Sequence, residues 1–262
     1  MPELAEVESY RRLAERVALG RIIAAVDAPD GWYLKGGLTE EAIRSALTGR
    51  TFTAAQRIGK LLLLPTSNGG PVLGLRFGMT GRLIVDGIVG VEELWYASNR
   101  DEMRWERFGV GFVDGGRLIM RDPRRLGGVE LDPSEGRLGP DALRLGLGQL
   151  RRALDESRAP LKARLLDQKH VAGVGNLAAD EALWRAGLSP VRPAGSLTEA
   201  ELRRLHRHLR KTLEDFLLRG GSHTGELMGE RRAGGVCPKD GSPLRRETVG
   251  TRTTWWCPEH QQ

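Results

Sequence analysis

The sequence has few cysteines and no long apolar run, and each scarcity excludes a class of protein. Its two cysteines, Cys237 and Cys257, both lie close to the C-terminus, so a disulfide framework of the secreted kind is excluded. No run of about 18 apolar residues occurs, so we expect no membrane-spanning helix and no membrane partner. The N-terminus lacks a basic segment followed by an apolar one, so we expect no secretory signal and a cytoplasmic location.

Basic residues outnumber acidic ones, and the excess is confined to one half of the chain. The net charge is +6 and the isoelectric point is near 9.7. Residues 1–132 contain 18 basic and 18 acidic side chains, so the whole excess lies in residues 133–262. This distribution indicates a polyanionic partner, most simply a nucleic acid, although a solvated Arg-rich surface would have the same composition.

The first part of the chain predicts a β-rich domain that begins with a helix. Residues 2–19 predict one amphipathic helix, and residues 39–47 predict an inserted one. Short, often β-branched segments between Gly-rich turns predict the strands of an antiparallel sandwich. These segments are residues 21–26, 51–55, 61–65, 72–77, 83–85, 110–113 and 118–120.

After residue 132 the pattern becomes helical, so we predict an α+β fold with three parts. Ser196 and Glu199 predict a capping box that opens a helix ending near residue 219. Residues 222–236 are polar and Gly-rich, which indicates a mobile loop, and residues 236–262 predict a hairpin. The other expected helices are residues 147–156, 161–169 and 176–185. The expected domains are residues 1–132, 133–221 and 222–262.

The N-terminal stretch carries groups that are suited to covalent catalysis. Removal of the initiator Met would leave Pro2 as a secondary amine, and an α-amino group has an unperturbed pKa of about 8. Such an amine is an available nucleophile that can form a cationic iminium with an aldehyde-like carbon. Glu3 and Glu6 follow on adjacent turns and could move protons beside it. Pro followed by acidic residues is also simply a good helix start.

Five further segments, taken with this stretch, resemble one enzyme family. They are Arg57-Ile58-Gly59-Lys60, Gly78-Met79-Thr80-Gly81, Asp122-Pro123-Arg124-Arg125-Leu126-Gly127, the segment from Leu166 to Asn176, and the segment 250–262. In this order they resemble the motifs of the formamidopyrimidine-DNA glycosylase / endonuclease VIII family. The resemblance implies an N-terminal catalytic β-sandwich, a C-terminal helix–two-turn–helix domain and a terminal hairpin similar to a zinc finger.

The resemblance also implies a reaction and the residues that perform it. Pro2 would attack C1′ of a damaged nucleotide and expel the base, and β,δ-elimination would then cut the strand on both sides. The implied catalytic residues are Pro2, Glu3, Glu6 and Lys60. The implied DNA-binding residues are Met79, Arg125, Leu126, Lys162, Asn176 and Arg252. The partner would be damaged double-stranded DNA, bound by a monomer that uses no organic cofactor.

The terminal hairpin departs from the two Cys-x-x-Cys pairs that are usual in this family. Here the four positions are Cys237, Asp240, Cys257 and His260. All four residue types are competent zinc ligands, so we predict a structural zinc site that binds more weakly than four thiolates. The alternative is a zinc-free hairpin stabilised by Trp255 and Trp256.

Other departures affect the expected lesion. Leu126 stands where the guanine-lesion enzymes usually have Phe, Arg76 replaces a usual His, and the loop 221–236 is short. We favour 8-oxoguanine and formamidopyrimidine lesions, with an endonuclease VIII-like enzyme for oxidised pyrimidines as the alternative. A non-catalytic binder of damaged DNA is a second alternative. An RNA-binding protein with a zinc ribbon is a third, disfavoured because aromatic stacking motifs are lacking.

Overall fold

The computed structural model describes residues 2–95, 97, 100 and 102–262. The chain forms two compact units, residues 1–135 and 136–262, which are described separately. No helix within the described residues is both long and apolar enough to cross a membrane.

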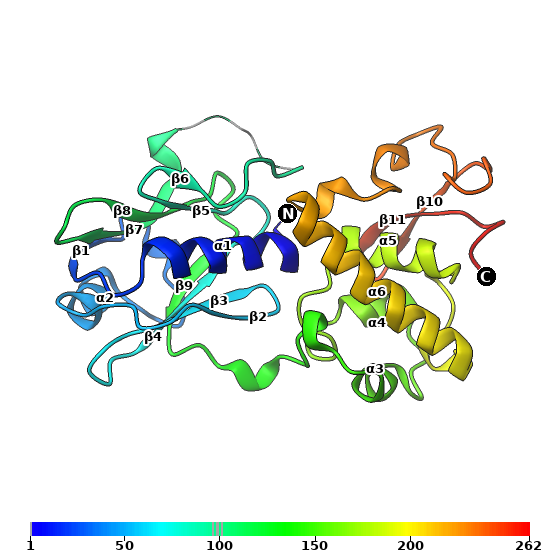
Figure 1. Ribbon diagram of the computed structural model, residues 1–262, viewed down its shortest axis with the longest axis horizontal. Coiled ribbons are helices and arrows are strands. Elements are labelled where there is room, and N and C mark those ends of the chain that lie inside the picture. Colours follow the sequence, from blue (N-terminus) through cyan, green and yellow to red (C-terminus); the bar gives the residue numbers. More distant parts are fainter. Residues whose placement is uncertain (1, 96, 98–99, 101) are drawn as a thin grey trace. The chain divides into compact units, whose positions relative to one another are not determined.

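The first unit is an antiparallel β-sandwich with α1 (Leu4–Val17) and α2 (Glu40–Leu47) beside it (Figure 1). One sheet has the strand order β1-β7-β8-β5-β6 and the other β2-β3-β4-β9. The strands are β1 (Ile23–Asp27), β2 (Gln56–Ile58), β3 (Leu61–Pro65), β4 (Val72–Arg76), β5 (Arg82–Val85), β6 (Ile88–Val89), β7 (Glu106–Phe112), β8 (Arg117–Arg121) and β9 (Gly128–Leu131). The predicted sandwich and N-terminal helix are confirmed.

Both sheets and α1 contribute to one apolar core. Leu62 pairs with Leu75 across β3 and β4, and both side chains are fully buried. From the other sheet, Val110 and Leu118 form a pair in the same core. Side chains alternate between the two faces of a strand, so this pattern fixes which face of each sheet turns inward.

The second unit is built around α5 (Asn176–Ala186), which is buried along almost its whole length. Figure 1 shows α6 (Glu199–Arg219) beside it, and α5 also packs against α4 (Leu161–Leu166) and β11 (Arg252–Trp256). The remaining elements are α3 (Leu147–Leu154) and β10 (Arg245–Val249), which pairs with β11. The apolar stripe of α6, formed by Leu202, Leu205, Leu209, Leu213 and Phe216, is buried, as expected for a helix with one apolar face.

Several local predictions differ from the structure. Residues 51–55 form only isolated bridges, whereas β2, β6 and β9 were not predicted. The cap of α6 is Thr198, whose hydroxyl accepts from Glu201 N while Glu201 Oε2 accepts from Thr198 N, so the capping box lies two residues later than predicted.

The loop 222–236 is anchored, contrary to the prediction of a mobile segment. Glu181 on α5 accepts hydrogen bonds from the backbone N–H groups of Glu226 and Leu227, at 3.1 and 3.0 Å. Leu227 is buried against Trp184, and Arg231 forms an ion pair with the buried Asp180. Polar, Gly-rich composition suggested mobility, but buried carboxylates on α5 hold the loop.

Glu201 offers a test of the α6 cap. The hydrogen bond from Arg192, opposed by burial and assisted by Thr198, lowers the pKa of Glu201 from 4.5 to about 2. Its stabilising contribution is therefore complete above pH 4.5 and lost as the pH falls toward 2. We expect Glu201→Gln to lower the free energy of unfolding by about 2 kcal/mol at pH 7.

Chemical denaturation at a series of pH values would measure this effect. The difference between Glu201→Gln and the parent protein should shrink as the pH falls from 5 to 2. Glu214→Gln, which breaks an exposed ion pair on the same helix, should change stability little at any pH. A difference for Glu201→Gln that does not vary with pH would contradict this explanation.

Candidate active site and nucleic-acid interface

The N-terminus of α1 places the predicted catalytic groups next to one another. Pro2 is buried and directly precedes Glu3, the N-cap residue of the helix. Glu3 and Glu6 are only 1% and 2% exposed, and Glu6 Oε2 accepts a hydrogen bond from the Glu3 backbone N–H at 2.9 Å. Carboxylates are favoured at a helix N-terminus by the helix dipole. The structure therefore holds two buried acids beside the residue that would supply the amine.

Lys60 lies in the two-residue turn between β2 and β3, and this hairpin packs against α1. An ion pair joins the hairpin to α1: Arg57 Nε lies 3.0 Å from Glu8 Oε2, and both side chains are largely buried. Burial alone would raise the pKa of Glu8, but hydrogen bonds from Arg57 and Arg11 outweigh it and lower that pKa. Glu8 is thus charged at neutral pH and fixes the Lys60 hairpin to the helix that carries Glu3 and Glu6.

The loops 78–81 and 122–127, here called the wedge loops, are joined by the fully buried Asp122. Its Oδ1 accepts from Thr80 Oγ1 at 2.5 Å and its Oδ2 from Gly127 N at 2.8 Å. Gly78 has φ +56°, and a Cβ there would lie 2.4 Å from the Leu126 carbonyl carbon, so only Gly fits. This arrangement brings Met79 and Leu126 onto adjoining loops, with Leu126 exposed.

Within the wedge loops, the Arg125 side chain is bound to another residue of the same chain. Its guanidinium makes two hydrogen bonds to Asp30, at 2.7 and 2.6 Å. The preceding residue, Arg124, is exposed, and its side chain has no hydrogen bond or ion pair within the described part of the chain. Arg124 is therefore the better candidate for contact with DNA, and the sequence alone could not separate two adjacent arginines.

In the second unit, the structure corrects the prediction that Lys162 contacts DNA. Lys162 is fully buried, with Nζ 2.7 Å from Asp180 Oδ1 and donating to Thr253 O and Thr254 Oγ1. A buried cation needs such partners. These three use the hydrogen-bonding capacity of the Lys162 ammonium, so it cannot also bind a phosphate. Lys162 instead pins the β10–β11 hairpin to α4 and α5.

The same hairpin brings Asn176 and Arg252 into one region. Asn176 Nδ2 donates to Thr253 O at 3.1 Å, while its buried Oδ1 has no hydrogen-bond partner among the described residues. Arg252 adjoins Thr253 and follows a turn in which Gly250 and Thr251 both have positive φ. Its side chain is exposed. The N-terminus of α5 and an exposed guanidinium together suit a phosphate group.

Arg252→Ala should weaken binding to any duplex, because a phosphate contact carries no sequence information. The slope of log affinity against log salt should fall by about 1. Titrations at several salt concentrations would measure this, with Arg246→Ala as the control because it removes the same charge from the paired strand. Equal slopes for Arg252→Ala and the parent protein would remove Arg252 from the interface.

Three of the four predicted metal ligands form a cluster. Single ligand atoms of Cys237, Asp240 and Cys257 all lie within 4.8 Å of one another, and the Cys257 sulfur is 3.5 Å from Asp240 Oδ2. In a tetrahedral site with zinc–sulfur bonds of about 2.3 Å, ligand atoms lie roughly 4 Å apart. These three residues therefore fit a zinc ion with only small movements.

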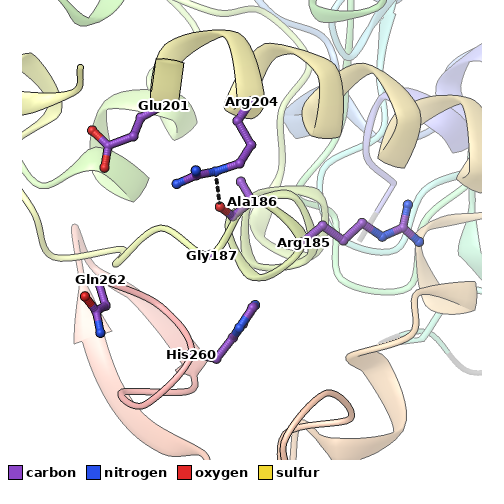
Figure 2. Close-up of a pocket in the computed structure, with 7 residues that line it drawn as sticks. All are labelled: Arg185, Ala186, Gly187, Glu201, Arg204, His260 and Gln262. Carbon is purple, nitrogen blue, oxygen red and sulfur yellow. Dashed lines mark hydrogen bonds between the residues drawn. The ribbon is translucent and has the colours of Figure 1, made fainter. Parts of the chain in front are cut away.

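His260 is not part of this cluster. Its Nε2 lies 2.8 Å from the Trp184 carbonyl oxygen and 2.9 Å from Lys239 Nζ. Figure 2 shows its ring directed toward the end of α5, where it lines a surface pocket of about 460 Å³. The pocket also contains Arg204, whose Nε donates to Ala186 O. His260 would have to rotate to become the fourth ligand.

Comparisons with known proteins agree with this architecture. The model of the formamidopyrimidine-DNA glycosylase N-terminal domain matches residues 1–129, and that of the formamidopyrimidine-DNA glycosylase H2TH domain matches residues 138–226. A formamidopyrimidine-DNA glycosylase of Thermus thermophilus is 36% identical, over 100% of this chain and 98% of its own length. One of a Nocardioides species is 33% identical, over 98% and 93% respectively.

Solved structures of Lactococcus lactis Fpg have the same fold. A complex of that protein with DNA containing N7-benzyl-Fapy-dG aligns with a TM-score of 0.83 and 27% identity. A complex with DNA containing an abasic site aligns with a TM-score of 0.84 and 26% identity. Both alignments cover 100% of each chain.

Fold and matches together define a DNA glycosylase, an enzyme whose partner is DNA. The chain belongs to the formamidopyrimidine-DNA glycosylase family.

Proposed function

We propose that this enzyme is a bifunctional glycosylase and AP lyase that removes oxidised bases through a covalent bond to Pro2. The observation that carries the proposal is the placement of Pro2 directly before the buried N-cap residue Glu3, on a helix whose first turn holds the buried Glu6. An α-amine beside two protected carboxyl groups suits covalent catalysis with local proton transfer. The relatives and the structures bound to damaged DNA support the same chemistry.

The proposed reaction begins with attack of the Pro2 amine on the damaged nucleotide. The Pro2 nitrogen lone pair forms a bond to C1′ as the N-glycosidic bond breaks, and the departing base takes up the proton that the amine loses. Opening of the sugar ring, assisted by proton transfer from Glu3, converts the adduct into an iminium. Loss of a C2′ proton then expels the 3′ phosphate, and loss of the C4′ proton in a second elimination expels the 5′ phosphate. The iminium accepts the electron pair released at C2′.

The remaining residues of this proposal bind rather than react. Lys60, Asn176 and Arg252 would hold phosphates, and Met79 would fill the space left when the damaged nucleotide leaves the stack. Arg124 would face the unpaired base opposite the lesion. The enzyme would act in the cytoplasm, where the DNA of its bacterial relatives lies.

We propose oxidised purines of the 8-oxoguanine and formamidopyrimidine class as substrates. The formamidopyrimidine in the names of a relative and of the DNA bound in one solved structure supports this choice. Oxidised pyrimidines are the alternative substrates. Two features favour them: the loop 222–236 is anchored, and Leu126 is exposed and aliphatic. Neither offers an aromatic ring on which a purine could stack. Single-turnover excision on duplexes with 8-oxoguanine, a formamidopyrimidine or an oxidised pyrimidine would decide. Faster release of the oxidised pyrimidine would overturn the purine assignment.

We propose that Cys237, Asp240 and Cys257 hold a structural zinc ion, with His260 as the fourth ligand after rotation. Protein purified without chelator or added metal should contain about one zinc per chain. Cys257→Ser should remove the metal and lower the melting temperature, because metal binding to the folded state stabilises it. His260→Ala tests the fourth ligand. Metal-free parent protein would contradict the zinc assignment and favour the hairpin stabilised by Trp255 and Trp256.

A further inference from the structure

Trp32 is an exposed aromatic side chain on a rigid base. It lies in the single helical turn Gly31–Tyr33 and is 70% exposed. Its neighbours Asp30, Tyr33 and Leu34 are all buried, which fixes the backbone of the turn. A Trp side chain buries a large area when it packs. A Trp that stays exposed on a fixed backbone therefore indicates a binding surface more strongly than one on a loose loop.

The turn that carries Trp32 is attached to the wedge loop 122–127. Asp30 binds Arg125 through two hydrogen bonds, and Lys35 N donates to Val129 O at 2.8 Å. Burial and the Asp122 carboxylate raise the pKa of Tyr33, which therefore stays protonated and donates to Asp122 Oδ2 at 3.4 Å. A Cβ on Gly127 would lie 2.4 Å from the Tyr33 hydroxyl oxygen. Trp32 thus belongs to the same rigid body as the wedge loops.

The surroundings of Trp32 suit a nucleic acid. Lys35 Nζ lies 5.3 Å from the centre of the Trp32 ring and donates to the Trp32 carbonyl oxygen. Arg124 is exposed on the attached loop, and Leu126 beside it is 52% exposed. An exposed aromatic ring beside a cation, on a surface that carries further positive charge, is a usual platform for stacking a nucleobase. Leu126 has no ring and cannot serve as that platform.

We propose that Trp32 stacks on a nucleobase exposed where the wedge loops open the duplex. In this position it supplies the aromatic surface that Leu126 lacks. The inference rests on the proposed function, since it requires that residues of the wedge loops enter DNA. It assigns to the turn Gly31–Tyr33 a part of the lesion-binding surface.

The test is the affinity for a duplex that contains tetrahydrofuran as a stable abasic site. Trp32→Leu keeps apolar bulk and removes the ring, whereas Trp32→Phe keeps a ring. We expect Trp32→Leu to weaken binding by about 10-fold and Trp32→Phe by less than about 3-fold. Leu126→Phe in the Trp32→Leu background should restore most of the loss, because it returns a ring to the surface. Leu218→Ala, at another exposed apolar side chain, should leave affinity unchanged.

The outcomes separate this inference from the proposed function. Unchanged affinity for Trp32→Leu would overturn the inference and leave Trp32 to some other partner. Equal losses of affinity for Trp32→Leu and Trp32→Phe would also overturn it, because an aromatic ring would then add nothing to DNA binding. Borohydride trapping of Trp32→Leu on abasic DNA at saturating protein should still succeed. If the parent protein neither binds nor becomes trapped, the proposed function itself fails.

Discussion

Replacing Pro2 with Gly should slow base release and strand cutting by at least about 100-fold. Gly leaves a primary, flexible amine in place of a secondary amine fixed by its ring, so the nucleophile loses its orientation. Single-turnover assays on a damaged duplex and on an abasic duplex would measure both activities. Duplex binding should persist, because the proposed phosphate contacts are on other residues.

An N-terminal extension that blocks the amine gives an independent control, because it leaves the Pro2 side chain in place. It should also abolish cutting. Mass spectrometry must show that the parent protein begins at Pro2. Unchanged nicking by either altered protein would remove Pro2 from the mechanism.

Replacing Glu3 with Gln should separate the two activities. Attack of Pro2 on C1′ becomes irreversible only when the sugar ring opens, and ring opening needs a proton donor, so the observed base release should fall by about 100- to 10,000-fold. A preformed abasic site exchanges with its open aldehyde, so its attack by Pro2 should suffer much less. Comparing the rate of base release from a lesion with the rate of trapping at an abasic site would show whether Glu3→Gln affects the first activity more than the second.

Glu15→Gln is the matched control for Glu3, since it changes the same functional group at the exposed end of α1. It should leave both activities intact. Parallel losses of both activities in Glu3→Gln would show that Glu3 maintains the N-terminus rather than moving a proton.

Sequence patterns predicted much of the fold because apolar spacing determines which face of each element is buried. The α6 stripe is one example, since it carries its own periodic signal, and β3 is another, since it is a short continuous apolar run. Residues 51–55 and β9 show the limit. A short strand depends on its partner, and β9 exists because it pairs with β4. That pairing has no local signature.

The candidate site shows a different limit. The sequence identifies Lys162, Arg125 and His260 as polar groups, but not their partners. Asp180 neutralises Lys162 inside the second unit, and Asp30 binds Arg125. His260 lies against Trp184 O. Each of these contacts joins distant parts of the chain, so local sequence could not reveal them. Trp32 was overlooked for the same reason.

Covalent trapping with borohydride tests the central proposal most directly. The panel would contain 8-oxoguanine opposite C, an oxidised pyrimidine, an abasic site and undamaged DNA. We predict an adduct on a damaged duplex and at the abasic site but not on undamaged DNA, with peptide mapping that places the linkage at Pro2. No adduct on any duplex, from protein shown to begin at Pro2, would contradict the account.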